Sequence, residues 1–190
     1  MLGNYGEIAV IRLISILLFL LLLPISAYAA DNAELRSIKE ADQADRRSSP
    51  TEEKWREIAL RDVERRERVL EIIKSGQLST AWDYFNAALV LQHGGSAEDI
   101  RRAHALSTIA ATIDPEHPQA KWLMAASWDR LMMRLNRRQW YGTQSTRDSS
   151  GVFALSPVEP GAVTDADRAA LGVPSLAEAQ ARIDARNNSE

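Results

Sequence analysis

Apolar residues recur three and four positions apart along most of this chain, whereas the strict alternation typical of β-strands is scarce. This pattern predicts five main helices, over about residues 31–47, 50–75, 80–93, 96–114 and 117–136. Ser49-Pro50 has the residues that favour a helix start, and Gly76 has the freedom that favours a helix end. Two shorter helices are predicted over residues 164–171 and from Ser175 onward. The sequence therefore predicts an all-α fold.

One stretch resembles the junction between two tetratricopeptide repeats, through Ala105, Ala110, Asp114-Pro115 and Trp122. A repeat array needs about three copies to bury its faces, and no second copy occurs here at a fixed period. We expect helical hairpins that are tetratricopeptide-like only in part. They form a single helical domain over residues 30–145, followed by an extension of loops and short helices over residues 146–190.

The segment between the fifth helix and the extension has a different composition. Residues 143–163 are rich in Ser, Thr, Gly and Pro, with one small apolar island at residues 152–155. This composition predicts a loop that contains a short strand. A connection of this length usually has a purpose of its own.

The first 29 residues have the three-part pattern of a secretory signal peptide. An apolar run at residues 13–23 follows Arg12, Pro24 ends it, and Ala27-Tyr28-Ala29 supplies small residues for cleavage between Ala29 and Ala30. The run is shorter than the roughly 20 residues that span a bilayer. We expect a periplasmic or secreted protein without a membrane anchor after cleavage. The alternative is an uncleaved N-terminal anchor.

Composition excludes several chemistries. The chain has no cysteine, which excludes disulfides, thiol catalysis and thiolate metal sites. Its net charge of −3 is not that of a nucleic-acid binder. The three histidines lack the spacing of metal ligands, so we expect neither a metal nor a cofactor.

Charged residues interrupt the apolar stripes of the first two helices. Asp42 and Arg46 continue the stripe of the first helix, and Asp62 and Arg66 lie in the stripe of the second, which begins with Trp55. Burial of such groups costs several kcal/mol unless they are paired. They either contribute to a polar site or form ordinary intrahelical ion pairs at i,i+4 spacing.

His93 and Asp129 have no such partner on their own helices. Histidine exchanges a proton near neutral pH, so His93 is a candidate general base that Asp129 or Asp62 would orient. Alternatively, His93 caps the helix that it ends, next to Gln92. We take His93 and Asp129 as the candidate catalytic residues.

The segment from Gln139 to Gln144 combines two amides, a phenol and a hydroxyl around a glycine. Gly142 favours a tight turn after the fifth helix. The segment either contributes Gln139, Tyr141, Thr143 and Gln144 to a site or terminates the helix, with its polar groups satisfying the backbone.

These motifs together resemble an uncharacterised bacterial family, one of the domains of unknown function. The resemblance rests on Asp42-Gln43-x-x-Arg46, Gln92-His93, Asp129-Arg130 and Gln139-x-Tyr141-Gly142-Thr143-Gln144, and it covers about residues 35–145. It implies a helical domain whose marked residues gather in one site, and it implies no activity.

The sequence leaves two functions open. The first is a site that binds a small polar or anionic ligand, or acts on it, although no nucleophile stands out. Its candidate ligand-binding residues are Asp42, Gln43, Arg46, Asp62, Gln92, Arg130, Gln139, Tyr141, Gly142, Thr143 and Gln144. The second is a non-enzymatic interaction or scaffold protein that binds a protein partner. An open pocket around His93 and Tyr141 favours the first, and a closed, fully paired network favours the second.

Overall fold

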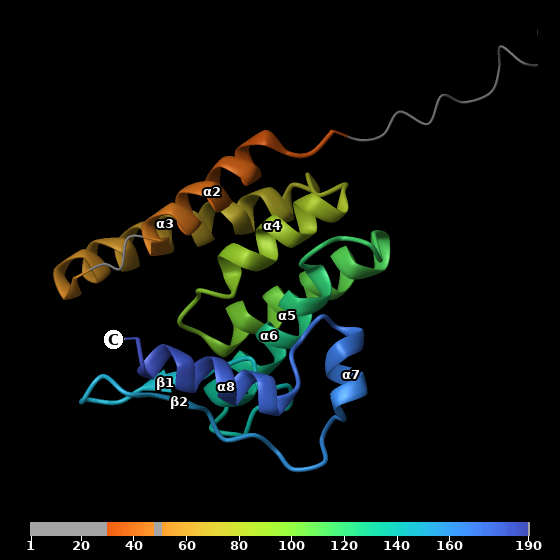
Figure 1. Ribbon diagram of the computed structural model, residues 1–190. Helices are drawn as coiled ribbons and strands as arrows, with labels where there is room; N and C mark the ends of the chain where they lie inside the picture. The colour runs from red at the N-terminus through yellow and green to blue at the C-terminus, as the bar shows by residue number, and fades with distance from the viewer. Residues whose placement is uncertain (1–29, 48–50, 190) are drawn as a thin grey trace, which may run out of the picture.

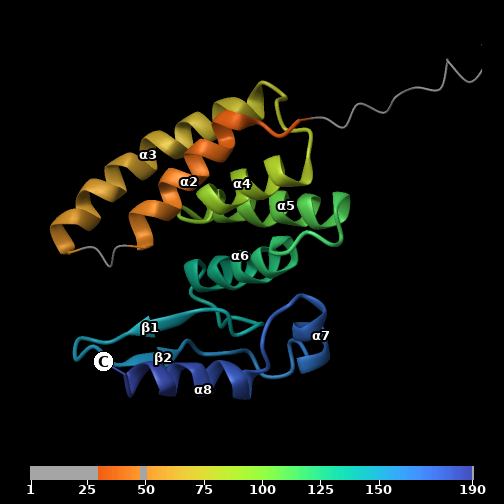
Figure 2. The ribbon, with the colours of Figure 1, turned by 45° about the horizontal axis from the view of Figure 1, so that its top comes forward.

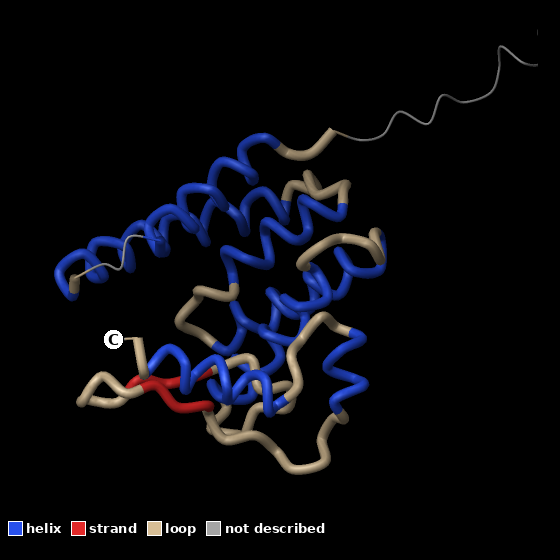
Figure 3. The backbone as a smooth tube through the Cα atoms, in the orientation of Figure 1, coloured by secondary structure: helices blue, strands red, loops and turns tan. Residues whose placement is uncertain are grey.

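The computed structural model describes residues 30–47 and 51–189 and is mostly helical, which confirms the predicted fold class (Figures 1 and 3). The predicted signal peptide lies outside these residues. The five main helices are α2 (Ala33–Arg47), α3 (Glu52–Lys74), α4 (Ala81–Leu91), α5 (Ala97–Ile113) and α6 (Ala120–Arg134). Among the described helices, none is long and apolar enough to cross a membrane.

The helices stack as hairpins in successive layers. Figure 2 shows α2 and α3 side by side above α4 and α5, with α6 below them. Helix α5 packs against both α4 and α6, while α2 and α3 cover α4. Ion pairs from Glu34 to Arg68 and from Asp45 to Arg61 join α2 to α3 and fix their antiparallel arrangement.

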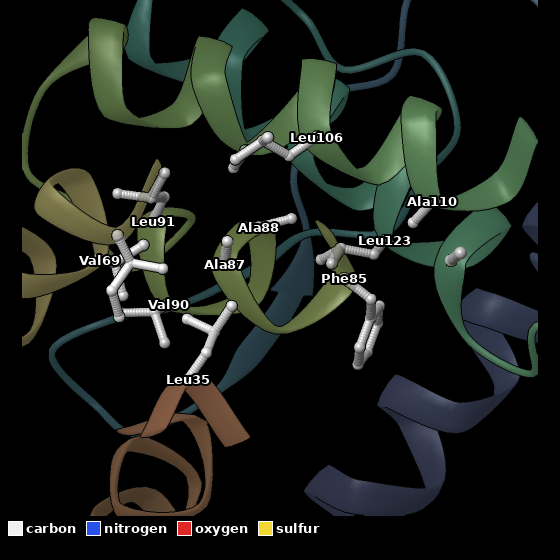
Figure 4. Close-up of a cluster of buried hydrophobic side chains, with 13 residues drawn as sticks. Leu35, Val69, Phe85, Ala87, Ala88, Val90, Leu91, Leu106, Ala110 and Leu123 are labelled. Atoms are coloured by element: carbon white, nitrogen blue, oxygen red, sulfur yellow. The ribbon is translucent and has the colours of Figure 1, made fainter. Parts of the chain in front are cut away.

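The main hydrophobic core lies around α4, which is the most apolar of the helices. Leu35 of α2, Val69 of α3 and Leu123 of α6 all reach the α4 side chains and are fully buried (Figure 4). Small residues such as Ala87 and Ala88 let the neighbouring helices approach closely. A smaller cluster holds Ile100, Leu131 and Met132 between α5 and α6.

Local signals set most helix ends as predicted. Thr80 and Asp83 form a capping box at the start of α4, and Gly76 adopts a φ of 72° after α3. Ser49-Pro50 falls in the undescribed residues 48–50, and the N-cap observed for α3 is Thr51, whose side chain accepts from the Lys54 amide at 3.3 Å. The prediction that Trp55 faces inward is wrong, because this side chain is 45% exposed.

The C-terminal region forms a small hairpin with two helices. Strands β1 (Ser145–Arg147) and β2 (Phe153–Leu155) pair antiparallel, followed by α7 (Asp165–Ala170) and α8 (Leu176–Asn187). The predicted short strand is thus β2, but its partner β1 was not predicted. The domain boundary predicted at residue 145 falls inside β1.

Candidate functional site

The structure places the predicted site residues in two groups on either side of Arg130. The first group comes from α2, α3 and the end of α4, and the second from α6 and the loop after it. Asp42, Gln43, Arg46, Asp62, Gln92 and His93 form the first group, and Asp129, Gln139, Tyr141, Gly142, Thr143 and Gln144 form the second.

Asp42 is the centre of the first group. Its carboxylate is fully buried and lies 3.0–3.1 Å from the Nδ1 atom of His93. It also accepts from Gln43 Nε2 and pairs with Arg46, each at 2.8 Å. The predicted Asp42–Arg46 pair is therefore confirmed. Three donors on one carboxylate offset the cost of burying its charge.

Arg46 extends this group to α3. Its Nη2 atom lies 2.6 Å from Asp62, which also accepts from Arg65 at 3.0 Å. The alternative of an intrahelical Asp62–Arg66 pair is wrong, since the Arg66 guanidinium lies 3.8 Å from Asp99 instead. The group is thus an interhelical network that joins α2 to α3.

Asp42 orients the His93 ring. The prediction that Asp129 or Asp62 would do so is wrong. His93 follows Gln92, the C-cap of α4, where the turn at Gly94 and Gly95 begins. Its Nδ1 atom donates to Asp42 instead of capping its own helix. No hydrogen bond within the described chain engages Nε2, so this nitrogen can accept a proton or a ligand's hydrogen bond.

A pocket of about 260 Å³ opens beside His93. We call it the α2–α4–α6 pocket after the helices that provide most of its walls. Its polar lining is Lys39, Gln43, Arg46, Gln92, His93 and Gln119, and its apolar lining is Phe85, Leu89, Trp122 and Leu123. No carboxylate of the described residues lines the pocket directly. Asp42 lies behind the lining residues His93, Gln43 and Arg46 and orients them by hydrogen bonds and an ion pair.

The second group is organised by Asp129, which is also fully buried. Its two carboxylate oxygens accept from the backbone amides of Trp140, Tyr141 and Thr143 at 2.7–3.0 Å and from the Thr143 hydroxyl at 2.8 Å. All four donors belong to the loop after α6. Asp129 therefore fixes the shape of this loop, and among the described residues its carboxylate forms no hydrogen bond or ion pair with His93.

Further bonds complete this second group. The buried Gln139 donates to the carbonyls of Gln144 and Ser156 and accepts from the Gln144 amide. Arg168 of α7 donates to the carbonyls of Trp140 and Tyr141 at 3.0 Å. The turn predicted at Gly142 is present, with a φ of 81°.

Tyr141 is held as a neutral phenol. Burial raises the pKa of its side chain, and the negative charges of Asp129 and Asp167 raise it further. The phenol does not line the pocket beside His93. The buried carboxylate of the second group thus spends its hydrogen bonds on its own loop, although Gly142, Thr143 and Gln144 also line a separate pocket with Arg182 of α8, away from His93.

Arg130 lies between the two groups. Its Nη1 atom is 3.4 Å from the Gln92 carbonyl, and its buried Nε atom has no hydrogen-bond partner. Burial lowers the pKa of this guanidinium, and the positive charges of Arg46 and Arg134 lower it further.

Sequence reasoning missed several residues that the geometry brings in. Lys39 and Trp122 line the pocket, and Arg168 holds the loop after α6 from a distant helix. Lys39 lies one turn before Gln43 on the same face of α2, and this i,i+4 spacing could have identified it as a pocket residue. Arg168 carries no such signal, because nothing in its sequence surroundings indicates burial.

Comparison of the chain with protein families, with curated proteins and with solved structures finds no match. The described residues also contain no group of three or more His, Asp or Glu side chains arranged to hold a metal ion. The function must therefore be argued from the site itself.

Proposed function

We propose that this is an exported helical protein that binds a small ligand with one anionic group in the α2–α4–α6 pocket. The observation that carries the proposal is the pairing of His93 with Asp42 at the wall of an open pocket. Fixed polar groups beside an open, partly apolar concavity are typical of small-molecule sites.

The charges around the pocket favour a single negative group. Arg46 is already neutralised by Asp42 and Asp62, whereas Lys39 forms no ion pair within the described residues. A ligand's carboxylate or phosphate would therefore pair with Lys39, while the amides of Gln43 and Gln92 bond its remaining oxygens. Phe85, Leu89 and Trp122 would contact an apolar part of the same ligand.

His93 would act on the ligand through Nε2. With Nδ1 donating to Asp42, Nε2 is the acceptor of the neutral ring. It would accept a hydrogen bond from a ligand hydroxyl or take its proton. Among the described residues, no Ser, Thr or Cys side chain lines the pocket, so we take binding as its function.

A ligand panel tests this proposal. Acetate, benzoate, inorganic phosphate and chloride would each be titrated into the purified protein, with calorimetry and thermal melting as readouts. We expect benzoate to bind best and to raise the melting temperature, because it combines one charge with a ring. If none of the other three probes binds more tightly than chloride, the proposal is wrong.

Two variants and a control localise the binding. Lys39→Met removes the cation that has no ion pair, and His93→Gln keeps a polar side chain without the ring. Each should weaken benzoate binding at least tenfold. Lys74→Met removes an exposed cation at the end of α3 and should leave binding unchanged.

Two expectations from the sequence remain part of the proposal. Export rests on the signal-peptide pattern of residues 1–29. Similarity to the uncharacterised bacterial family rests on its motifs, of which Gln43, Arg46, Gln92 and His93 line the pocket.

A second candidate function is that of an interaction protein. It is favoured by apolar residues that α3 exposes near its start, namely Trp55, Leu60 and Val63, which are 43–71% exposed. Light scattering of the purified protein tests it in its simplest form, self-association. Under this hypothesis Trp55→Ser would shift a dimer to a monomer.

A further inference from the structure

The C-terminal end of α6 carries an unusual concentration of positive charge. Arg130, Arg134, Arg137 and Arg138 lie within nine residues, and no ion pair engages any of them within the described part of the chain. Most other arginines of α2, α3 and α5 pair with carboxylates, such as Arg65 with Asp45. In a chain of net charge −3, such a cluster is not a consequence of composition.

Two adjoining pockets bring these arginines to one groove. Arg130 and Arg134 line the first, of about 400 Å³, together with Gln144. Arg137 and Arg138 line the second, of about 360 Å³, where the end of α6 meets the β1–β2 hairpin. Asn136 and Met133 line both pockets, so the two halves of the groove lie side by side.

Two buried donors at this groove lack partners. The Nε atom of Arg130 is one, and the hydroxyl of Ser156, a residue only 2% exposed that lines the second pocket, is the other. Buried polar groups in proteins are almost always hydrogen-bonded, so each unmet donor needs an explanation. A bound oxyanion provides acceptors for such donors.

The electrostatic surroundings of Arg130 also favour a bound anion. Burial removes much of its hydration, and the nearby positive charges of Arg134 and of Arg46, which pairs with Asp42 and Asp62, give it no counter-ion. The negative end of the α6 dipole amounts to about half a charge, which does not balance two guanidinium groups. A buried cation without a counter-ion is costly, and an anion from solution would offset that cost.

The backbone at the centre of the groove also has a special conformation. Asn136 has a φ of 56°, in the left-handed region that non-glycine residues seldom adopt. It follows Leu135, the C-cap of α6, and the Arg137 amide closes the turn by donating to the Met132 carbonyl at 2.8 Å. This turn places Arg134 and Arg137 on opposite sides of Asn136, one in each half of the groove.

We propose that this groove binds a small anion with two oxyanion groups, one held by Arg130 and Arg134 and the other by Arg137 and Arg138. Guanidinium groups bind carboxylate and phosphate oxygens in pairs, and two such clamps select a ligand with two groups over a ligand with one. None of these four arginines lines the α2–α4–α6 pocket, so this site and the proposed function can fail independently.

Calorimetry on the purified protein with pyrophosphate, inorganic phosphate and succinate tests the proposal. We expect pyrophosphate or succinate to bind at least tenfold more tightly than phosphate, with an affinity that falls as salt rises. Equal binding of phosphate and pyrophosphate would contradict the two-clamp arrangement. An oligonucleotide that binds more tightly as its length increases would overturn it in favour of a nucleic-acid surface.

Variants separate binding from stability. Arg134→Gln with Arg137→Gln changes one exposed side chain in each half of the groove and should weaken binding at least tenfold. Arg56→Gln with Arg47→Gln removes the same charge from exposed positions of α3 and α2, and should change binding less than twofold.

Arg130→Met provides a second, ligand-free readout. Removal of a buried charge that lacks a counter-ion should leave the melting temperature equal or higher, while binding of the preferred anion is lost. A large fall in melting temperature would show that Arg130 serves the fold, and would contradict its role as an anion-binding residue.

Discussion

Single carboxylates decide the local structure at several points of this molecule, and Asp129 is the clearest case. One side chain accepts four hydrogen bonds from a loop that has little regular structure of its own. The loop's shape is therefore encoded in α6, ten or more residues before the donors that it binds.

Asp129→Ala should lower the free energy of unfolding by about 3–5 kcal/mol, because it leaves three partly buried amides and the Thr143 hydroxyl without their acceptor. Urea denaturation would measure this loss. Tyr141→Phe is the control, since no hydrogen bond of its hydroxyl is found in the described structure, and it should cost less than about 1 kcal/mol. Equal losses in the two variants would mean that the carboxylate has no special role.

Gly142 is a second residue whose identity matters. It combines a φ of 81° with a close approach, because an added Cβ atom would lie 2.6 Å from the end of the Leu176 side chain. Gly142→Ala should therefore cost more than the roughly 1 kcal/mol of left-handed strain. Gly172→Ala is the matched control, with a φ of 68° and no atom within 4 Å of the new Cβ. Thermal melts that rank Gly172→Ala as the more damaging change would refute this packing argument.

At the scale of elements, the start of α6 depends on an imidazole. His117 is buried against Trp82 and Phe85, and its Nδ1 atom accepts from the amides of Gln119 and Ala120 at 3.2 Å. The sequence predicted a helix start near His117, but α6 begins at Ala120 and the histidine side chain caps it from outside.

This cap should make stability depend on pH. Burial lowers the pKa of His117, although the charge of Asp114 opposes the shift. The neutral ring's contribution is therefore complete above the unfolded-state pKa of 6.5 and is lost as the pH falls through the lower folded-state pKa. Urea denaturation at pH 7.5 and 5.0 should show this loss, at most about 1.4 kcal/mol per pH unit.

His117→Gln provides the comparison for that measurement. The variant should be less stable at pH 7.5 and should lose less than the parent on acidification. Parallel pH profiles of the two proteins would assign the acid sensitivity to other groups.

The sequence predicted helices well and contacts between them poorly, for a physical reason. Caps and apolar spacing act within a few residues, so Thr80, Ser96 and Gly76 indicated the helix ends correctly. Pairing within a helix was also correct for Asp42 and Arg46. The partner of His93 depends on how α2 crosses α4, and spacing along one helix carries no information about that crossing.

Because spacing along one helix carries no information about contacts between helices, the sequence also could not predict that the site residues divide into two groups. The motif residues looked alike because both groups place polar side chains on apolar faces. Only tertiary structure shows that Asp129 meets four donors from its own loop, while His93 borders a pocket. Burial of a polar residue can thus be predicted from sequence, but the partner that makes it structural or functional cannot.

At the scale of the whole molecule, the described chain begins with contacts that fix its N-terminal end. The Asn32 amide donates to Asp83 at 2.7 Å, and the Thr80 hydroxyl donates to Asp31 at 2.8 Å. Burial alone would raise the pKa of Asp83, but hydrogen bonds from the amides of Ser79, Asn32 and Thr80 outweigh it and lower the pKa. These contacts lie directly after the predicted cleavage site.

Mass spectrometry of the protein purified from expressing bacteria tests the predicted cleavage site. We expect a mature chain that begins at Ala30, because cleavage there leaves Asp31 and Asn32 in place. A chain that retains residues 1–29 would instead support the uncleaved anchor.

The arrangement of Asp129 also has a consequence for the order of folding. Its donors, from Trp140 to Thr143, leave the ribosome after α6 does. Until they arrive, the carboxylate must keep its water or take up a proton, and α6 cannot complete its packing. The hairpins of α2 to α5 have mostly local contacts and can form early. The last turns of α6 therefore wait for downstream sequence, and a polypeptide stalled near residue 138 would remain a partly folded intermediate.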